Sequence, residues 1–220
     1  MYKKKLHSLI ILIPAFNELK NLKRFIKNLN YSYNILVIDD GSTDKTFSWL
    51  KRNKIHVKKN NKNLGYEKSL IIGFKQILKI KKYKYILTMD ADGQHLKSEI
   101  KKFVAKKNQK FDLIVGSRSK KNRFIERVIS YYFSNFFKIN DPLSGFKLYK
   151  TTILKKIDFT KISDLFLIDL LVENLQNNIK IKNINVTIKK RIGNPRVGNY
   201  LNVSIKMFKI LLYLFKKRIT

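Results

Sequence analysis

Cysteine is absent from this chain of 220 residues. Disulfide bonds and thiolate metal sites are therefore excluded, while the redox compartment stays open. A chain of this length buries one sizeable hydrophobic core, so a single domain is expected, with room for one appended element. We place that domain at residues 1–200 and predict an amphipathic helix at residues 201–220.

Long apolar runs are also missing. The run at Leu9–Ala15 is brief, is broken by Pro14 and lacks a cleavage site of small residues, so no secretory signal peptide is predicted. Near the C-terminus, the uncharged apolar run Ile210–Phe215 is far shorter than the roughly 20 residues of a membrane-spanning helix. A cytoplasmic location is the resulting expectation.

Acidic residues are scarce. The chain has 15 Asp and Glu and 48 Lys and Arg, which gives a formal charge of +33. So large a charge suggests binding to nucleic acid or to an anionic membrane. Only 8 of the basic residues are Arg, however, and Lys is spread over nearly every segment beside Asn and Ile. A general compositional bias is the favoured interpretation, and attraction to anionic lipid is the second. No nucleic-acid-binding motif accompanies the charge, so no nucleic-acid partner is expected.

The most informative stretch contains two carboxylates that directly follow an apolar run. Tyr85–Met89 is predicted to be a buried strand, and Asp90 and Asp92 fall where it ends. Gly93 permits the bend that would bring Gln94 to the same point. Ligands of open α/β sheets bind at the carboxyl ends of strands, and hard oxygen donors suit Mg²⁺ or Mn²⁺. The alternative is a polar turn in which each Asp accepts hydrogen bonds from its own backbone.

Apolar runs and helical periodicities alternate along the rest of the chain. Strands are expected at 8–13, 34–38, 55–58, 85–89, 111–115, 146–149 and 179–188, and helices over 19–29, from 47, and over 70–78, 122–137, 164–176 and 201–220. Ser42 or Thr43 is the expected cap of the second helix. The alternation predicts an α/β fold with a mostly parallel, doubly wound sheet flanked by helices.

Three polar loops would then meet at the carboxyl edge of this sheet, at residues 14–18, 39–44 and 90–94. An acidic cluster is costly unless a cation offsets its charge. Because acidic residues are few in this chain, their convergence favours a cation site. The alternative for Asp39 and Asp40 is that they cap the helix that follows them.

Three features further along have open interpretations. Arg118 is a candidate phosphate ligand or an ordinary ion-pair residue. Residues 122–137 are strongly apolar and aromatic, which fits either the core or a surface that meets lipid. In the last helix, Lys206, Lys209 and Lys216 share a polar stripe, and apolar residues cover the rest. Such a helix either lies in a membrane interface with its lysines toward lipid phosphates or packs in a dimer groove, which leaves a homo-oligomer open.

Five motifs taken together resemble those of the family-two glycosyltransferases. They are Pro14–Glu18, Asp39–Asp44, Asp90–His95, Gly116–Arg118 and Asp141–Phe146. Their order and approximate spacing agree from residue 8 to about residue 200. The chain is most similar to polyprenyl-phosphate sugar synthases of the dolichyl-phosphate mannose synthase type. The resemblance implies the nucleotide-sugar-binding GT-A fold and hexosyltransferase activity.

The resemblance also implies roles for individual residues. Those expected to bind the nucleotide sugar are Pro14, Ala15, Glu18, Asp39, Asp40, Asp90, Arg118, Arg191 and Arg196. Mg²⁺ or Mn²⁺ is expected to be held by Asp90, Asp92 and Gln94.

The chain departs from the family pattern at three points. Leu96 replaces the usual Pro, Pro195 replaces a common Ser in the basic loop at 189–198, and Asp169 fills the family's acidic helix position. The composition of that basic loop, with two glycines and a proline, fits a mobile anion-binding lid.

The expected reaction is an inverting, metal-dependent transfer from a nucleotide sugar, in which Asp92 serves catalysis through the metal. A polyprenyl-phosphate acceptor, reached from an anionic membrane surface on the inner face of the membrane, is already ionised and needs no strong base. A sugar hydroxyl of a cell-surface glycan is the alternative acceptor. It requires a carboxylate to take its proton, with Asp141 as the first candidate and Asp169 as the second. A basic nucleic-acid-binding protein and a catalytically inactive membrane scaffold are the remaining alternatives.

Overall fold

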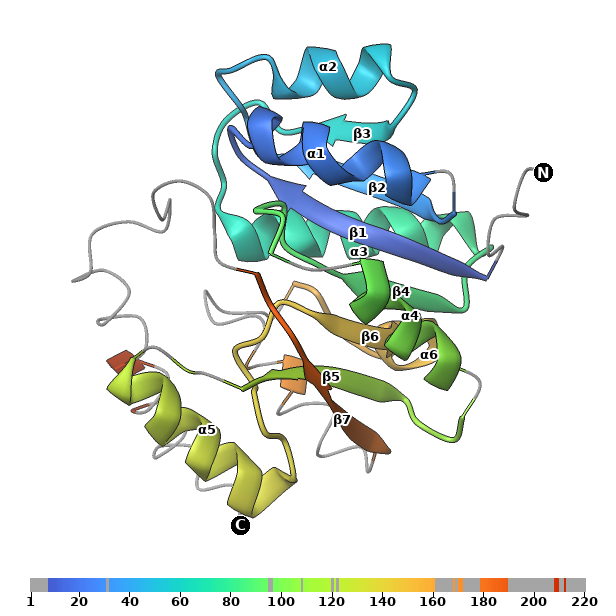
Figure 1. Cartoon of the computed structure of the whole chain (residues 1–220). Coiled ribbons are helices and arrows are strands. Elements are labelled where there is room, and N and C mark those ends of the chain that lie inside the picture. The colour runs from blue at the N-terminus through green and yellow to red at the C-terminus, as the bar shows by residue number, and fades with distance from the viewer. Residues whose placement is uncertain are drawn as a thin grey trace.

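The computed structural model describes residues 8–30, 32–94, 97–107, 109–119, 121, 123–160, 168, 170–171, 179–189, 208–209 and 212. The elements described there (Figure 1) are, in chain order, β1 (Leu9–Ala15), α1 (Leu19–Asn30), β2 (Asn34–Asp39), α2 (Thr46–Arg52), β3 (His56–Lys59), α3 (Tyr66–Ile80), β4 (Tyr85–Thr88), α4 (Lys97–Lys106), β5 (Leu113–Arg118), α5 (Phe124–Phe137), β6 (Lys147–Lys150), α6 (Thr151–Leu154) and β7 (Ile181–Val186).

The strands form one seven-stranded sheet in the order β3-β2-β1-β4-β6-β5-β7. β6 runs antiparallel to both of its neighbours, β4 and β5, and the other neighbouring pairs are parallel. In the parallel pairs, Ala15 lies beside Asp39, and Leu12 lies beside Thr88. The carboxyl ends of β1, β2 and β4 therefore meet at one edge of the sheet, which confirms the predicted mostly parallel architecture.

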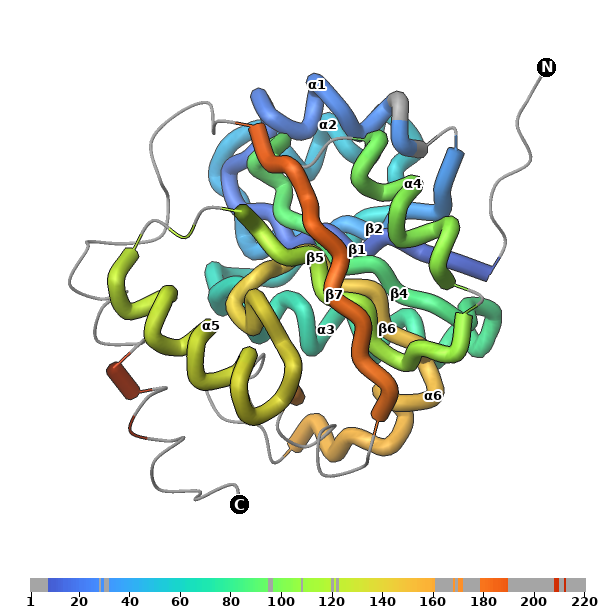
Figure 2. The backbone as a smooth tube through the Cα atoms, turned by 60° about the horizontal axis from the view of Figure 1, so that its bottom comes forward, coloured from blue at the N-terminus to red at the C-terminus, as the bar shows by residue number. Residues whose placement is uncertain are grey.

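Successive residues of β1 face opposite sides of the sheet, and helices cover both sides. Ile10 belongs to a buried cluster with Phe74 of α3, and this cluster also includes residues of α5 and α6. Ile11 belongs to a second cluster with Leu22 of α1, which also includes residues of α2 and α4. Figure 2 shows α1, α2 and α4 on one side of the strands and α3 and α6 on the other. Burial on both faces explains why the strands read as nearly continuous apolar runs.

Helix α5 has one buried side and one exposed side. Ile129 and Phe133 are fully buried in the core. Phe124, Tyr131 and Phe136 have exposed fractions of 74%, 72% and 65%. The core interpretation of this apolar segment therefore holds for one side of the helix, while the other side presents aromatic rings to the surroundings.

Three local expectations differ from the structure. The strand expected at 111–115 instead runs from Leu113 to Arg118, so it includes Gly116–Arg118. Helix α2 begins at Thr46, and the carboxylate of Asp44 accepts the backbone N–H of Thr46 at 2.8 Å, so neither Ser42 nor Thr43 caps this helix. Finally, α4 and α6 are helices that the sequence periodicity does not predict.

Most of the predicted helix at 164–176, the basic loop from residue 190 and most of residues 201–220 lie outside the described residues. Residues 168, 170 and 171 are helical, as are 208, 209 and 212. The division into residues 1–200 and 201–220 stays a prediction. In the part of the chain that is described, no helix has both the length and the apolar character needed to cross a membrane.

Candidate active site

The loops after β1 and β2 are joined by the side chain of Asn17. Its Oδ1 accepts hydrogen bonds from the backbone N–H groups of Thr43 at 2.8 Å and Asp44 at 3.1 Å. Its own backbone N–H donates to the hydroxyl of Ser42 at 2.9 Å. Asn17 has a φ of 53°, a left-handed conformation that asparagine adopts more readily than most residues. These contacts hold two of the three predicted loops together at the sheet edge.

Asp39 ends β2 and is fully buried. Its Oδ1 accepts a hydrogen bond from the backbone N–H of Ser42 at 2.7 Å. Its Oδ2 is buried and has no hydrogen-bond partner among the described residues. A buried carboxylate oxygen is costly to leave unpaired, so Asp39 offers an acceptor that an N–H group of a ligand would satisfy.

Asp40 is engaged by the chain itself. Its carboxylate accepts hydrogen bonds from the side-chain amide of Asn60 at 2.9 Å and from the backbone N–H groups of Leu64 at 2.9 Å and Gly65 at 2.8 Å. Gly65 directly precedes α3, so the negative charge lies at the positive end of that helix. Neither Asp39 nor Asp40 caps α2, and Asp40 instead anchors the loop that leads into α3. Its contact with a nucleotide sugar stays a prediction.

The turn after β4 carries the two carboxylates and the amide of the predicted metal site. Gly93 has a φ of 74°, and Asp92 Oδ1 accepts a hydrogen bond from the backbone N–H of Gln94 at 3.0 Å. This is the bond that the polar-turn interpretation expects. Gln94 also pairs with Lys189, because its side-chain amide donates to the Lys189 carbonyl at 2.9 Å and its own carbonyl accepts the Lys189 N–H at 2.9 Å. The start of the basic loop therefore lies beside this turn.

Asp90 is contacted by two residues that are distant in the sequence. The hydroxyl of Tyr66, the first residue of α3, donates a hydrogen bond to Asp90 Oδ1 at 2.8 Å. Gly145 approaches so closely that a Cβ at this position would lie 2.5 Å from the same oxygen. The loop that contains Gly145 therefore packs directly against the first carboxylate of the turn.

Arg118, at the end of β5, forms a bidentate ion pair with Asp141. Its Nε lies 2.7 Å from Asp141 Oδ2, its Nη2 lies 3.0 Å from Oδ1, and its backbone N–H donates to Oδ2 at 3.1 Å. Asp141 is fully buried, whereas the Arg118 side chain is 25% exposed. Burial alone would lower the pKa of the Arg118 guanidinium, but the hydrogen bonds and charge of Asp141, with the charges of Glu126 and Asp90, raise it. Arg118 is thus a permanent cation near Asp90.

This ion pair changes the interpretation of Asp141. The Asp141 carboxylate is already engaged by three hydrogen bonds from one arginine, and its burial keeps an acceptor hydroxyl away. The geometry therefore disfavours Asp141 as the general base and suits it to fix the orientation of Arg118. Asp169, the second candidate base, lies outside the described residues, as do Arg191 and Arg196.

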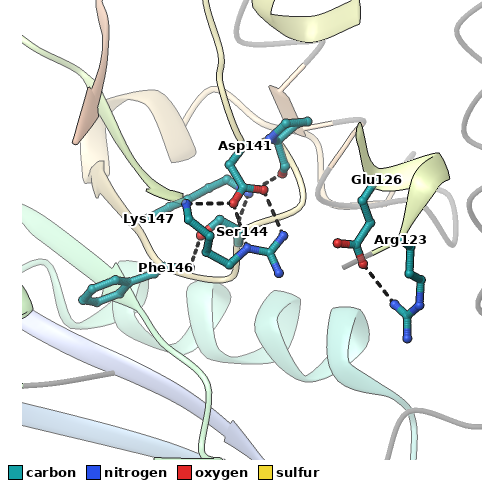
Figure 3. A network of polar contacts seen from close by, with 8 residues as sticks. Arg123, Glu126, Asp141, Ser144, Phe146 and Lys147 are labelled. Carbon is teal, nitrogen blue, oxygen red and sulfur yellow. Dashed lines mark hydrogen bonds and ion pairs between the residues drawn. The ribbon is translucent and has the colours of Figure 1, made fainter. Parts of the chain in front are cut away.

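Lys147 is a buried cation next to this ion pair. Its ammonium donates hydrogen bonds to the carbonyl oxygens of Pro142 and Ser144, each at 2.7 Å (Figure 3). Burial lowers the pKa of Lys147 to about 8, against the opposing influence of Asp141. The sequence does not reveal this role, because nothing in a chain with 48 basic residues marks one lysine as buried.

The remaining predicted residues lie at the same edge of the sheet. Pro14 and Ala15 are buried at the end of β1, and Glu18 is buried where α1 begins, accepting a hydrogen bond from Asn21 Nδ2 at 2.6 Å. The structure therefore brings together Pro14, Ala15, Glu18, Asp39, Asp40, Asp90, Asp92, Gln94, Arg118 and Asp141.

The donor atoms of the turn after β4 fit a divalent cation that shares its shell with a ligand. In the described ranges, no group of three or more His, Cys, Asp or Glu side chains is suited to hold a metal. Asp90, Asp92 and Gln94 offer two carboxylates and one amide. Mg²⁺ or Mn²⁺ commonly binds one or two carboxylates and completes its coordination with phosphate and water. The set therefore fits such an ion when a diphosphate accompanies it.

The sheet is mostly parallel and has helices on both faces. The Asp90-Ala91-Asp92 turn and Arg118 lie at its carboxyl edge. Together these features define a glycosyltransferase of the GT-A fold. Residues 10–162 match Glycosyl transferase family 2. The chain belongs to this family.

Comparisons with individual proteins agree with this assignment. The chain is 25% identical over 226 residues to the polyprenol monophosphomannose synthase of Mycolicibacterium smegmatis, and the matched region covers 91% of this chain and 84% of that protein. It is 28% identical over 178 residues to the UDP-N-acetylglucosamine–dolichyl-phosphate N-acetylglucosaminyltransferase of Methanococcus voltae, and this matched region covers 66% of this chain and 70% of that protein. The solved glucosyl-3-phosphoglycerate synthase of Mycobacterium tuberculosis, in complex with Mn²⁺, UDP and phosphoglyceric acid, matches with a TM-score of 0.75 and 16% identity over 98% of this chain and 80% of that chain. This likeness confirms the predicted fold.

Proposed function

We propose that this glycosyltransferase moves a hexose from a GDP- or UDP-linked sugar to a polyprenyl phosphate, with inversion of the anomeric carbon and a requirement for Mg²⁺ or Mn²⁺. One observation carries the proposal: an acidic turn and an arginine converge at the sheet edge, and Asp141, the first candidate base, is bonded to that arginine. The names of two relatives, a polyprenol monophosphomannose synthase and a dolichyl-phosphate N-acetylglucosaminyltransferase, support the acceptor class.

The nucleoside of the donor is assigned to the loops after β1 and β2. Pro14, Ala15 and Glu18 would contact it from one loop. Asp39 would accept a hydrogen bond from the base through its buried Oδ2, which is otherwise unpaired in the described part of the chain. Satisfying this oxygen would recover the free energy that its burial costs.

The diphosphate of the donor is assigned to the turn after β4 and to cationic side chains. Asp90, Asp92 and Gln94 would hold Mg²⁺ or Mn²⁺, which when bound offsets the negative charge of the leaving diphosphate. Arg118 would pair with phosphate oxygens through the part of its guanidinium that Asp141 does not engage. The basic loop with Arg191 and Arg196 is assigned the same role.

A phosphate acceptor suits this site better than a hydroxyl acceptor. A lipid phosphate is already ionised, so its attack on the sugar needs no general base. A glycan hydroxyl would need one, and the first candidate, Asp141, is buried and bonded to Arg118. Asp169 would then have to take the proton.

We assign the protein to the inner face of the membrane, where a polyprenyl phosphate presents its headgroup. Phe124, Tyr131 and Phe136 of α5 expose rings that suit a membrane interface. In the proposed interfacial helix at 201–220, Phe208 and Leu212 are exposed as well. The net charge of +33 would draw these surfaces toward anionic headgroups.

The substitution Asp92→Asn tests the proposed site. It removes one charge from the turn and keeps the shape of the side chain, so cation binding should weaken and transfer should fall by roughly 100-fold or more. The measurement is transfer of labelled hexose to polyprenyl phosphate with Mn²⁺, using a panel of GDP- and UDP-linked sugars.

The matched control is Asp112→Asn. Asp112 precedes β5, at the opposite end of that strand from Arg118, and pairs with Lys150 at 2.9 Å. This variant should keep its activity. Full activity of Asp92→Asn, or wild-type transfer that proceeds without a divalent ion, contradicts the metal assignment. Transfer only to glycan hydroxyls contradicts the lipid acceptor.

A further inference from the structure

The hydroxyl of Tyr66 donates a hydrogen bond to Oδ1 of Asp90, the first carboxylate of the proposed metal site, at 2.8 Å. We propose that Tyr66 is a positioning residue, which fixes the Asp90 carboxylate in the orientation that binds the cation and diphosphate of the donor. This role rests on the proposed function of Asp90. Tyr66 would act through Asp90 without taking part in the chemical step.

The backbone of Tyr66 is itself held in place. It begins α3, directly after Gly65, and the N–H groups of Leu64 and Gly65 both donate to the buried carboxylate of Asp40. A short series of contacts therefore runs from Asp40, through the start of α3, to the hydroxyl on Asp90. Asp40 thereby gains a role at the site even without touching the donor.

Gly145 restricts Asp90 from another direction. A Cβ at Gly145 would lie 2.5 Å from Asp90 Oδ1 and 2.6 Å from the Tyr66 hydroxyl oxygen, so the backbone packs against both groups. The carbonyl of Gly145 accepts a hydrogen bond from the Thr88 hydroxyl at 2.7 Å, which fixes the glycine relative to β4. The carboxylate thus lies between a hydrogen-bond donor and a piece of backbone that is itself bonded to β4.

This arrangement lowers the cost of forming the cation site. An aspartate that is free to rotate must be ordered when it binds a metal, whereas one held by a hydroxyl and a close backbone contact is already oriented. Partners in the outer shell of a metal site typically contribute 10- to 100-fold to metal affinity. Tyr66, which is 37% exposed at the start of a helix, has no sequence signal for such a role.

The first test is the Mn²⁺ affinity of Tyr66→Phe in the presence of GDP or UDP, measured through the water proton relaxation of protein-bound Mn²⁺. The substitution keeps the ring and removes the hydroxyl, so the Kd for Mn²⁺ should rise roughly tenfold or more. The matched control is Tyr83→Phe, whose partly buried ring packs against the core, and its Kd should equal that of the wild type.

The second test separates positioning from a general effect on the fold. For Tyr66→Phe, the Mn²⁺ concentration that gives half-maximal transfer should rise, while kcat at saturating Mn²⁺ should approach the wild-type value. The unfolding temperature without Mn²⁺ and nucleotide should be unchanged. A merely structural defect would instead lower the unfolding temperature and would not be rescued by excess Mn²⁺.

Gly145→Ala probes the same carboxylate from the other direction. The added methyl group would force Asp90 or Tyr66 to shift, so Mn²⁺ binding should weaken here too. If this variant does not fold, the two tests of Tyr66→Phe decide the matter without it.

Asp90→Asn distinguishes failure of this inference from failure of the proposed function. Loss of Mn²⁺ binding in Asp90→Asn, together with wild-type affinity in Tyr66→Phe, overturns the positioning role and leaves the proposed function intact. Absence of Mn²⁺ binding by the wild-type protein with either nucleotide overturns both.

Discussion

Lys147 carries its positive charge inside the protein, where it holds the loop that contains Asp141. It is fully buried, and its ammonium donates to two carbonyl oxygens of that loop. Burial and the charge of Arg118 lower the pKa of Lys147, the charges of Asp141 and Asp90 raise it, and the result is about 8. A lysine in an unfolded chain has a pKa of about 10.4. The folded state therefore binds this proton less tightly than the unfolded state does.

We expect the free energy of unfolding to rise with pH between about pH 8 and about pH 10.4. Below this window both states carry the proton, so the folded state bears the full cost of a buried charge. Within the window the folded protein releases the proton before the unfolded chain does. The cost is then relieved, by at most about 3 kcal/mol for a pKa difference of this size. Urea unfolding at a series of pH values across the window measures the trend.

Lys147→Met separates this effect from that of the net charge. The charge of +33 falls as pH rises, which also relieves repulsion in the folded protein. The variant keeps an unbranched stem and lacks the ionisable group, so its stability should rise less steeply than that of the wild type. Equal slopes for the two proteins contradict a lowered pKa at Lys147.

Helix α5 is buried on one side and carries exposed aromatic rings elsewhere. Ile129 and Phe133 are part of the core, so this helix cannot leave the domain without exposing them. Phe124, Tyr131 and Phe136 of the same helix are each exposed by more than half. Because the buried side fixes the helix, the exposed rings are held at fixed places on the surface of the domain.

Replacing Phe124, Tyr131 and Phe136 together by serine should weaken binding to phospholipid vesicles by about tenfold or more, since each ring loses apolar area that the interface would bury. The folding stability should change little, because most of the surface of these side chains is exposed. Sedimentation with vesicles measures the bound fraction. Ile80→Ser, at an exposed apolar residue that ends α3, is the control and should bind as the wild type does. Undiminished binding of the triple variant contradicts a role for α5 at the membrane.

An element can be predicted from the sequence when its own residues carry a clear hydrophobic pattern, and it is missed when they do not. Strands such as β1 and β2 are buried on both faces, so their apolar runs are unmistakable. Helix α4 escapes because Ile100 and Phe103 are its only fully buried apolar residues among many lysines. The sequence also does not reveal the antiparallel direction of β6, because the alternation of side chains along a strand is the same in either direction.

At the scale of the whole molecule, the site is predictable to the extent that the sheet topology determines it. Once the sheet is parallel, the ends of β1, β2 and β4 must meet, which places Asp39 and Asp90 at one edge. The contacts of Tyr66 and Gly145 with Asp90 join residues 24 and 55 positions away from it, so no local pattern reveals them. The same holds for the ion pair of Asp141 with Arg118, which joins residues 23 positions apart.

The net charge of +33 is a property of the whole chain, and two interpretations of it make different predictions. If the charge attracts the protein to anionic lipid, each lysine near the surface contributes about 1 kcal/mol, and salt screens that contribution over a Debye length of about 10 Å at 0.1 M. If the charge is only a compositional bias, anionic lipid should have little effect on binding.

We therefore expect the wild-type protein to bind vesicles containing anionic lipid much more strongly than neutral vesicles at low salt, and to lose most of this preference as the salt concentration rises above roughly 0.5 M. Sedimentation with both kinds of vesicle across a salt series measures this. Binding that survives high salt should be the part that the aromatic side of α5 supplies, because burial of apolar surface is not screened by ions. The triple serine variant should consequently lose the salt-resistant part and keep the salt-sensitive part. Equal binding to neutral and anionic vesicles at every salt concentration would instead favour the compositional interpretation.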